Sequence, residues 1–121
     1  MAQQLVVSGS FAIPLEDGGA VAQVDLKQAF NVTQRADFSR VYDALVTDDV
    51  VNLGTLATAG AKGFIIKCKS GSCTVKLNGS TVAISLDAGA EIMYVNPVSG
   101  WLTTATISTT GPATILFLAV S

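Results

Sequence analysis

Hydrophobic and polar residues alternate with a period of two over residues 63–86, in the run GFIIKCKSGSCTVKLNGSTVAISL. The run contains three alternating segments, separated by KSGS and by Asn78-Gly79. An Asn-Gly pair favours a two-residue hairpin turn, because both central positions of that turn need a positive φ. The pattern therefore predicts a three-stranded antiparallel meander at about 63–86.

The two turns expected in this meander predict the same buried face. A two-residue loop at Asn78-Gly79 pairs Val75 with Val82, and a four-residue loop at 69–72 pairs the two preceding segments. Because strand side chains alternate, both loops bring the same set of residues to one side of the sheet. The expected face consists of Phe64, Ile66, Cys68, Cys73, Val75, Leu77, Val82 and Ile84.

Five further segments show strand-like patterns. They are 5–13, with a kink expected at Gly9, and 20–30, 91–95, 101–109 and 113–120, with DAGA, NPVSG and TGP as turns or breaks. Short strands with turns every eight to twelve residues are typical of sandwiches and barrels. We therefore predict an all-β fold, an antiparallel β-sandwich of jelly-roll type, in a single domain over 1–121.

The segment 38–46 fits two interpretations. Phe38, Val41, Tyr42 and Leu45 lie at helical spacing, whereas Phe38, Arg40, Tyr42 and Val46 share a strand face. We favour a strand, because the segment is short and its neighbours are all β. A single helical turn is the alternative.

The composition indicates that the protein associates with other chains. Half of the 121 residues are apolar and only 13% are charged, against about a quarter charged in a typical soluble domain. Exposed apolar surface on this scale usually marks an interface. A monomer with a surface rich in Thr and Ser is the alternative interpretation.

The segment 113–120 suggests where such an interface lies. Ile115, Phe117 and Ala119 alternate with a second apolar set, Leu116, Leu118 and Val120. A sandwich strand has one face toward the core, so a strand that is apolar on both faces needs a second cover. We expect another subunit to cover Leu116, Leu118 and Val120, with Trp101 as a further anchor; a loop of the same chain is the alternative.

No catalytic, cofactor or metal site is predicted. The chain contains no histidine, which removes the commonest general base and most zinc or iron sites. The adjacent carboxylates Glu16/Asp17 and Asp48/Asp49 are expected in turns or solvated loops, as is typical of Asp. We expect the protein not to be an enzyme.

Cys68 and Cys73 are the sharpest local feature. The four-residue loop predicted between them places them opposite each other, where a cross-strand disulfide can form. Two buried free thiols in a reducing cytosol are the alternative. A zinc ion would need ligands from a second chain.

Nucleic-acid and membrane partners are not expected. The sequence has no basic cluster with interleaved aromatic residues. Its start lacks the charge and apolar run of a signal peptide, and its longest apolar run, 115–120, is too short to cross a bilayer. We expect a protein made in the host cytoplasm and not inserted in a membrane.

Several stretches resemble small accessory proteins of tailed-phage virions, over residues 35–121. They are SRVYDALVT, NLGTL, KGFIIKCKSGSCTVKLNGS, VNPVSGW and GPATILFLAVS. The resemblance implies a jelly-roll or related β-sandwich, often trimeric, found as a capsid decoration or cement protein, a head fibre or a tail component. It implies no catalytic residues.

The expected function is therefore that of a structural subunit in a virion. A homo-oligomeric decoration or cement protein, with a trimer favoured, would bind other copies of itself and partners such as the major capsid protein. The alternative is a glycan- or receptor-binding module of a phage tail or fibre. Sugars stack on aromatic side chains at loops, and Trp101 follows the NPVSG loop.

Overall fold

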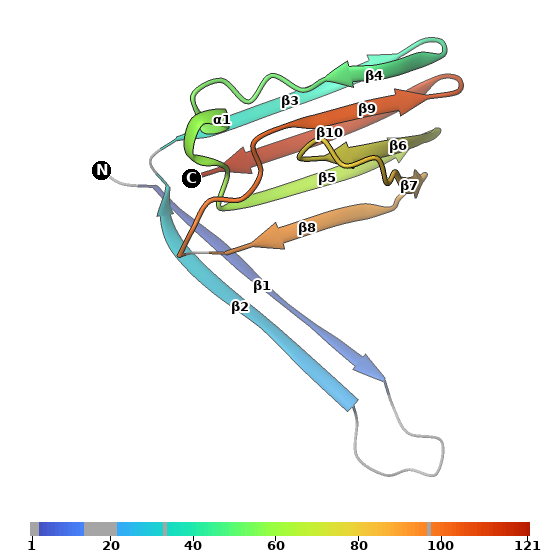
Figure 1. Cartoon of the computed structure of the whole chain (residues 1–121). Coiled ribbons are helices and arrows are strands. Elements are labelled where there is room, and N and C mark those ends of the chain that lie inside the picture. Colours follow the sequence, from blue (N-terminus) through green and yellow to red (C-terminus); the bar gives the residue numbers. More distant parts are fainter. Residues whose placement is uncertain (1–2, 14–21, 33, 97) are drawn as a thin grey trace.

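The computed structural model describes residues 3–13, 22–32, 34–96 and 98–121 (Figure 1). Nearly all regular structure in these residues is β. The elements are β1 (Gln3–Ile13), β2 (Ala22–Val32), β3 (Arg35–Tyr42), β4 (Val46–Val50), α1 (Leu56–Ala59), β5 (Gly63–Ser70), β6 (Ser72–Leu77), β7 (Ile84–Asp87), β8 (Glu91–Val95), β9 (Ala105–Thr109) and β10 (Ala113–Val120).

Eight of these strands form two four-stranded antiparallel sheets. One has the order β3-β10-β5-β8 and is called the β10 sheet below; the other has the order β4-β9-β6-β7 and is called the β9 sheet. The pairs β3–β10, β4–β9, β5–β8 and β6–β7 trace one long hairpin that has been rolled up, which is the strand order of a jelly roll. The expected all-β sandwich is confirmed.

The core lies between the two sheets. Alternate residues of β5, β6, β9 and β10 point inward and are almost fully buried, among them Ile66 and Ile115 from the β10 sheet and Val75 and Ile107 from the β9 sheet. Six of the eight residues predicted for the buried face within 63–86 are in the core, although they come from two sheets and not from one: Phe64, Ile66, Cys68, Cys73, Val75 and Leu77. The prediction is wrong for Val82 and Ile84, which are 70% and 40% exposed.

The three-stranded meander predicted at 63–86 is wrong. β5 belongs to the β10 sheet and β6 to the β9 sheet, so the chain crosses the sandwich at Gly71 instead of forming a hairpin. Both edges of β5 are already paired, with β10 and with β8, which leaves no edge for β6. Gly71 has a φ of 73°, and a Cβ there would lie 2.1 Å from the carbonyl oxygen of Pro112, so the crossing requires glycine.

The Asn78-Gly79 turn forms as predicted, but the ladder beside it has a different register. Both residues have positive φ, 54° and 70°, and the Ser80 N–H donates to the Leu77 carbonyl at 3.0 Å. Val75 pairs with Ile84 and not with Val82. The Asn78 side chain binds the neighbouring segment instead: its amide donates to the Trp101 carbonyl, and its oxygen accepts from the Thr103 N–H, both at 2.8 Å.

The ambiguous segment 38–46 is strand up to Tyr42, and β4 begins at Val46. Strands were also predicted correctly at 91–95 and 113–120. The strand predicted over 101–109 is shorter, because only Ala105–Thr109 joins the β9 sheet and Leu102 makes an isolated bridge to Ala61. The single-turn helix α1 was not predicted.

Strands β1 and β2 form a separate two-stranded sheet that runs diagonally away from the sandwich (Figure 1). Their ladder is continuous from Gln3↔Val32 to Ile13↔Ala22. The kink predicted at Gly9 is absent, since Gly9 pairs with Leu26 within the unbroken register. The expected domain, 1–121, includes this hairpin, whereas the sandwich takes its strands from residues 35–120.

Candidate interaction surface

Strand β10 lies in the middle of its sheet, between β3 and β5. Its inward residues Ile115 and Phe117 are 0% and 3% exposed. Leu116 and Leu118 point to the opposite side, away from the core, and are half-buried. The structure thus places two large aliphatic side chains on the outside of a sheet whose other face already covers the core.

Neighbouring strands extend this apolar surface. Leu118 pairs with Ile65 of β5, and Ile65 pairs with Met93 of β8, which is 47% exposed. We call the four residues Ile65, Met93, Leu116 and Leu118 the outer stripe. One end of the outer stripe is an open hollow of about 470 Å³, lined by Asp37, Ser39, Ile65, Leu116, Phe117 and Leu118.

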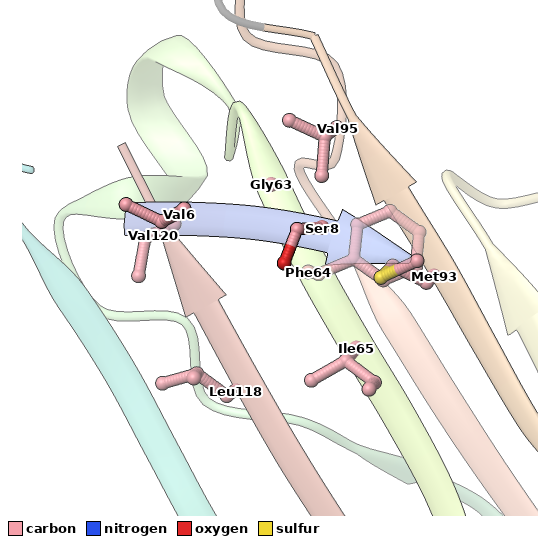
Figure 2. A pocket seen from close by; sticks show the side chains of 9 residues that line it. All are labelled: Val6, Ser8, Gly63, Phe64, Ile65, Met93, Val95, Leu118 and Val120. Atoms are coloured by element: carbon pink, nitrogen blue, oxygen red, sulfur yellow. The ribbon is translucent and has the colours of Figure 1, made fainter. Parts of the chain in front are cut away.

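The other end of the outer stripe is crossed by β1 (Figure 2). Val6 and Ser8 of β1 lie over the sheet and, with Leu118, Val120 and Met93 among others, line a cavity of about 310 Å³. Val120 is buried here, but Val6 remains 61% exposed. A strand of the same chain, and not the loop given as the alternative, therefore lies over part of the surface and leaves the end at Leu116 open.

Trp101, the fourth residue expected at the interface, lies apart from the outer stripe. Its ring packs against Tyr94 at a centroid distance of 5.1 Å and against Phe64 at 6.1 Å. Phe64 and Tyr94 alternate with Ile65 and Met93 along their strands, so they point to the opposite face of the sheet. The predicted set of Leu116, Leu118, Val120 and Trp101 therefore does not form one surface.

Cys68 and Cys73 are both buried free thiols in the structure. They face the core from different sheets, and the hairpin that would have aligned them across one ladder does not form. The Cys68 thiol donates to the carbonyl oxygens of Ser70 and Gly71 at 3.4 and 3.6 Å. Burial, with a smaller contribution from Cys68, raises the pKa of Cys73 to about 12, so its thiol stays protonated and unreactive at neutral pH.

A polar cluster that sequence reasoning missed joins the two sheets at their β3 and β4 edges. The Tyr42 hydroxyl donates to Asp49 Oδ2 at 2.7 Å, and Arg40 forms an ion pair with the same carboxylate. The hydrogen bond from Tyr42 lowers the pKa of Asp49, and burial together with that bond raises the pKa of Tyr42 to about 12. Asp49 lies in β4, so it is not in the turn or solvated loop predicted for Asp48/Asp49.

Glu16 and Asp17, the other predicted pair, lie outside the described residues. Among the residues that the structure does describe, no group of three or more His, Cys, Asp and Glu side chains could hold a metal ion. No helix in the same part of the chain is long and apolar enough to cross a bilayer.

Ile65 and Met93 belong to the outer stripe but were not predicted to do so. The sequence carries one signal for Ile65. An apolar residue at this position breaks the expected alternation and gives the continuous apolar run Phe64-Ile65-Ile66. Unbroken apolar runs are typical of strands that are covered on both faces. Met93 has no comparable signal, since only the pairing of β5 with β8 places it beside Ile65.

Comparison with known proteins does not assign a family. No family model matches the chain, and no curated protein matches it significantly. Two crystal structures show weak similarity. A protein of unknown function, DUF1255, from Acinetobacter sp. ADP1 has a TM-score of 0.46 and 12% identity, covering 98% of this chain and 94% of that one. A putative ethanolamine utilization protein Q from Salmonella typhimurium LT2 has a TM-score of 0.45 and 9% identity, covering 96% and 97%. Similarity at this level indicates nothing about function.

Proposed function

We propose that this protein is a non-catalytic structural subunit of a viral particle, an oligomeric decoration or cement protein of the capsid. The observation that carries the proposal is the outer stripe, an apolar surface on the outside of a sheet that already covers the core. Contiguous apolar patches on the surface of a soluble protein commonly mark interaction sites.

The chemistry of the outer stripe suits assembly with other proteins. Its members are aliphatic side chains and a methionine held on paired strands, so little backbone entropy is lost when a partner binds. Removing apolar surface from water contributes roughly 25 cal/mol per Å², and the net affinity is what remains after the costs of association.

The low charge and the resemblance to accessory proteins of phage virions support the same proposal. Sixteen charged side chains among 121 residues leave much of the surface free of charges that would oppose close contact. The proposed partners are further copies of this chain, with a trimer favoured, and the major capsid protein. The proposed location is the outside of the virion.

Two measurements test this function. The mass of the purified chain in solution should be a small multiple of the monomer mass. The chain should also co-sediment with expanded shells assembled from the major capsid protein of the same virus, and Leu116→Asp should weaken that binding more than Thr114→Asp on the same face. A chain that remains monomeric at high concentration and does not bind shells would overturn the proposal.

A second candidate function rests on Trp101. Its ring is 42% exposed beside Tyr94, and the loop before it carries the polar side chains of Asn96 and Ser99. An exposed indole beside a second ring is the type of surface on which sugar rings stack. On this alternative, the chain would be a glycan-recognising module of a tail or fibre.

The glycan alternative has a direct test, because Trp101 is the only tryptophan of the chain. Titration with cell-surface polysaccharides of a host bacterium should change the intrinsic fluorescence, and Trp101→Ala should abolish binding while the oligomer persists. Loss of the oligomer in Trp101→Ala, without any sugar binding by the wild type, would instead favour the structural role.

A further inference from the structure

The β1–β2 hairpin has a long and regular ladder. Its ladder pairs eleven residues of β1 with eleven of β2 without a register shift. The hairpin nevertheless stands largely apart from the sandwich (Figure 1). Because an isolated two-stranded hairpin is marginally stable in water, a hairpin of this length needs a surface to pack against.

The register assigns the hairpin residues to two faces of different character. Cross-strand partners share a face, and the face alternates along each strand. One face takes the positions of Gln3, Leu5, Val7, Gly9, Phe11, Ile13, Ala22, Val24, Leu26, Gln28, Phe30 and Val32. The other takes those of Gln4, Val6, Ser8, Ser10, Ala12, Gln23, Asp25, Lys27, Ala29 and Asn31. The first set is mainly apolar and the second mainly polar.

The more polar face is the one turned toward the chain's own sandwich. Val6 and Ser8 belong to it, and both lie over the β10 sheet (Figure 2). The fit is loose, since a cavity of about 310 Å³ separates β1 from the sheet and Val6 stays 61% exposed. Close-packed interiors contain few voids larger than one water molecule. The apolar face of the hairpin is therefore turned away from the outer stripe of the same chain.

We propose that the apolar face of the hairpin packs on the outer stripe of a second copy of this chain. Each copy then gives one hairpin and receives one. This inference rests on the self-association in the proposed function and specifies its contact. The hairpin supplies apolar positions such as Phe11 and Leu26, and the receiving sheet supplies Leu116 and Ile65, which the copy's own β1 leaves partly open.

The size of the hairpin face suits this exchange. Eleven residues at about 3.4 Å each make the hairpin about 37 Å long, and two strands cover about 10 Å of width. One hairpin face is therefore about 370 Å². A copy that gives one hairpin and receives another would contribute about 740 Å², close to the roughly 800 Å² per partner of a standard stable interface.

Charge-introducing variants of the full-length chain test the exchange, each with a matched control. Phe11→Asp places a charge on the apolar face of the hairpin, and Ala12→Asp places the same charge on the opposite face of the same strand. Leu116→Asp places a charge on the outer stripe where β1 does not reach, and Thr114→Asp lies on the same face of β10. Far-ultraviolet circular dichroism verifies that each variant is folded.

Solution mass gives the first result. We expect a wild-type oligomer, and a fall to the monomer mass in Phe11→Asp and in Leu116→Asp but in neither control. An equimolar mixture of Phe11→Asp and Leu116→Asp should then recover a complex of twice the monomer mass, because one variant keeps an intact sheet and the other an intact hairpin. A hairpin packed only within its own chain predicts no recovery.

The other outcomes separate this inference from the proposed function. An oligomer that persists in Phe11→Asp overturns the hairpin exchange and leaves the structural role standing. A monomeric wild type also overturns the exchange, and shell binding then decides the function alone. If that monomer binds shells and Phe11→Asp does not, the occupant of the hairpin face is the capsid protein and not a second copy.

Discussion

The two faces of strand β10 have the same kind of residue and different surroundings. On the inner face, Ile115 and Phe117 are almost completely buried between the sheets. On the outer face, Leu116 and Leu118 are half-buried below an open hollow and a loosely seated β1. Residue type therefore does not distinguish the core face from the outer face of this strand; the two faces differ in what packs against them.

This difference predicts different contributions to the stability of the isolated chain. The inner face contacts a second sheet that is part of the same chain, so its burial is complete before any partner binds. The outer face gains full burial only when something else covers it, and the mutations below separate the two cases.

Ile115→Ala should have the largest effect. It removes a fully buried side chain from the core and leaves a cavity, which typically lowers the free energy of unfolding by about 2–5 kcal/mol. Urea unfolding followed by circular dichroism measures the loss. A loss below about 1 kcal/mol would contradict the assignment of Ile115 to a close-packed core.

Tyr42→Phe should have the next largest effect, at the rim of the same inner face. It removes the hydrogen bond to Asp49 at 2.7 Å and keeps the ring in place. A hydrogen bond to a charged group contributes about 1.5 kcal/mol or more, and partial exposure of Asp49 keeps the expected loss near that lower value. Tyr42→Phe combined with Asp49→Asn should lose less than the sum of the two single losses, and full additivity would show that the pair does not interact.

Leu116→Ala should cost the isolated chain about 1 kcal/mol, because only part of the side chain is buried. The dependence of unfolding on protein concentration separates the two faces more clearly. Unfolding of the wild type should shift to higher urea as the protein concentration rises, whereas Leu116→Ala should reduce that shift. Equal losses for Leu116→Ala and Ile115→Ala in dilute solution would remove the distinction between the two faces.

A dependence of stability on pH is expected at the alkaline end as well, and it belongs to the inner face. The pKa of Cys73 is raised from 9.0 to about 12, and the pKa of Tyr42 from 10.0 to about 12. A raised pKa means that the folded state holds its proton more tightly, so the stabilisation is complete below the unfolded pKa and is lost as pH rises from 9 toward 12. Thermal unfolding across this range should show the decline, and Cys73→Val should remove the part that begins near pH 9. An unchanged profile in Cys73→Val would contradict the assigned burial of the thiol.

The candidate surface could be predicted in part. The alternation in 113–120 indicated a strand that is apolar on both sides, and the structure places Leu116 and Leu118 outside the core. The sequence could not place Trp101 relative to them. Trp101 lies in the connection between β8 and β9, which belong to different sheets, and nothing in the local pattern shows which side of the sandwich a connecting residue meets.

Sequence by itself determined most strands, the inward faces of β5, β6 and β10, and the Asn78-Gly79 turn, because alternation and turn chemistry are local properties. Tertiary structure alone decided which sheet each strand joins. The same residues of β5 and β6 would be buried in one hairpin or in two sheets that face each other, so the pattern cannot tell these folds apart. They include Phe64, Ile66, Cys73 and Val75. The choice is made by β8 and β10, which occupy both edges of β5 although they come much later in the sequence, so that only the rolled fold brings them to it.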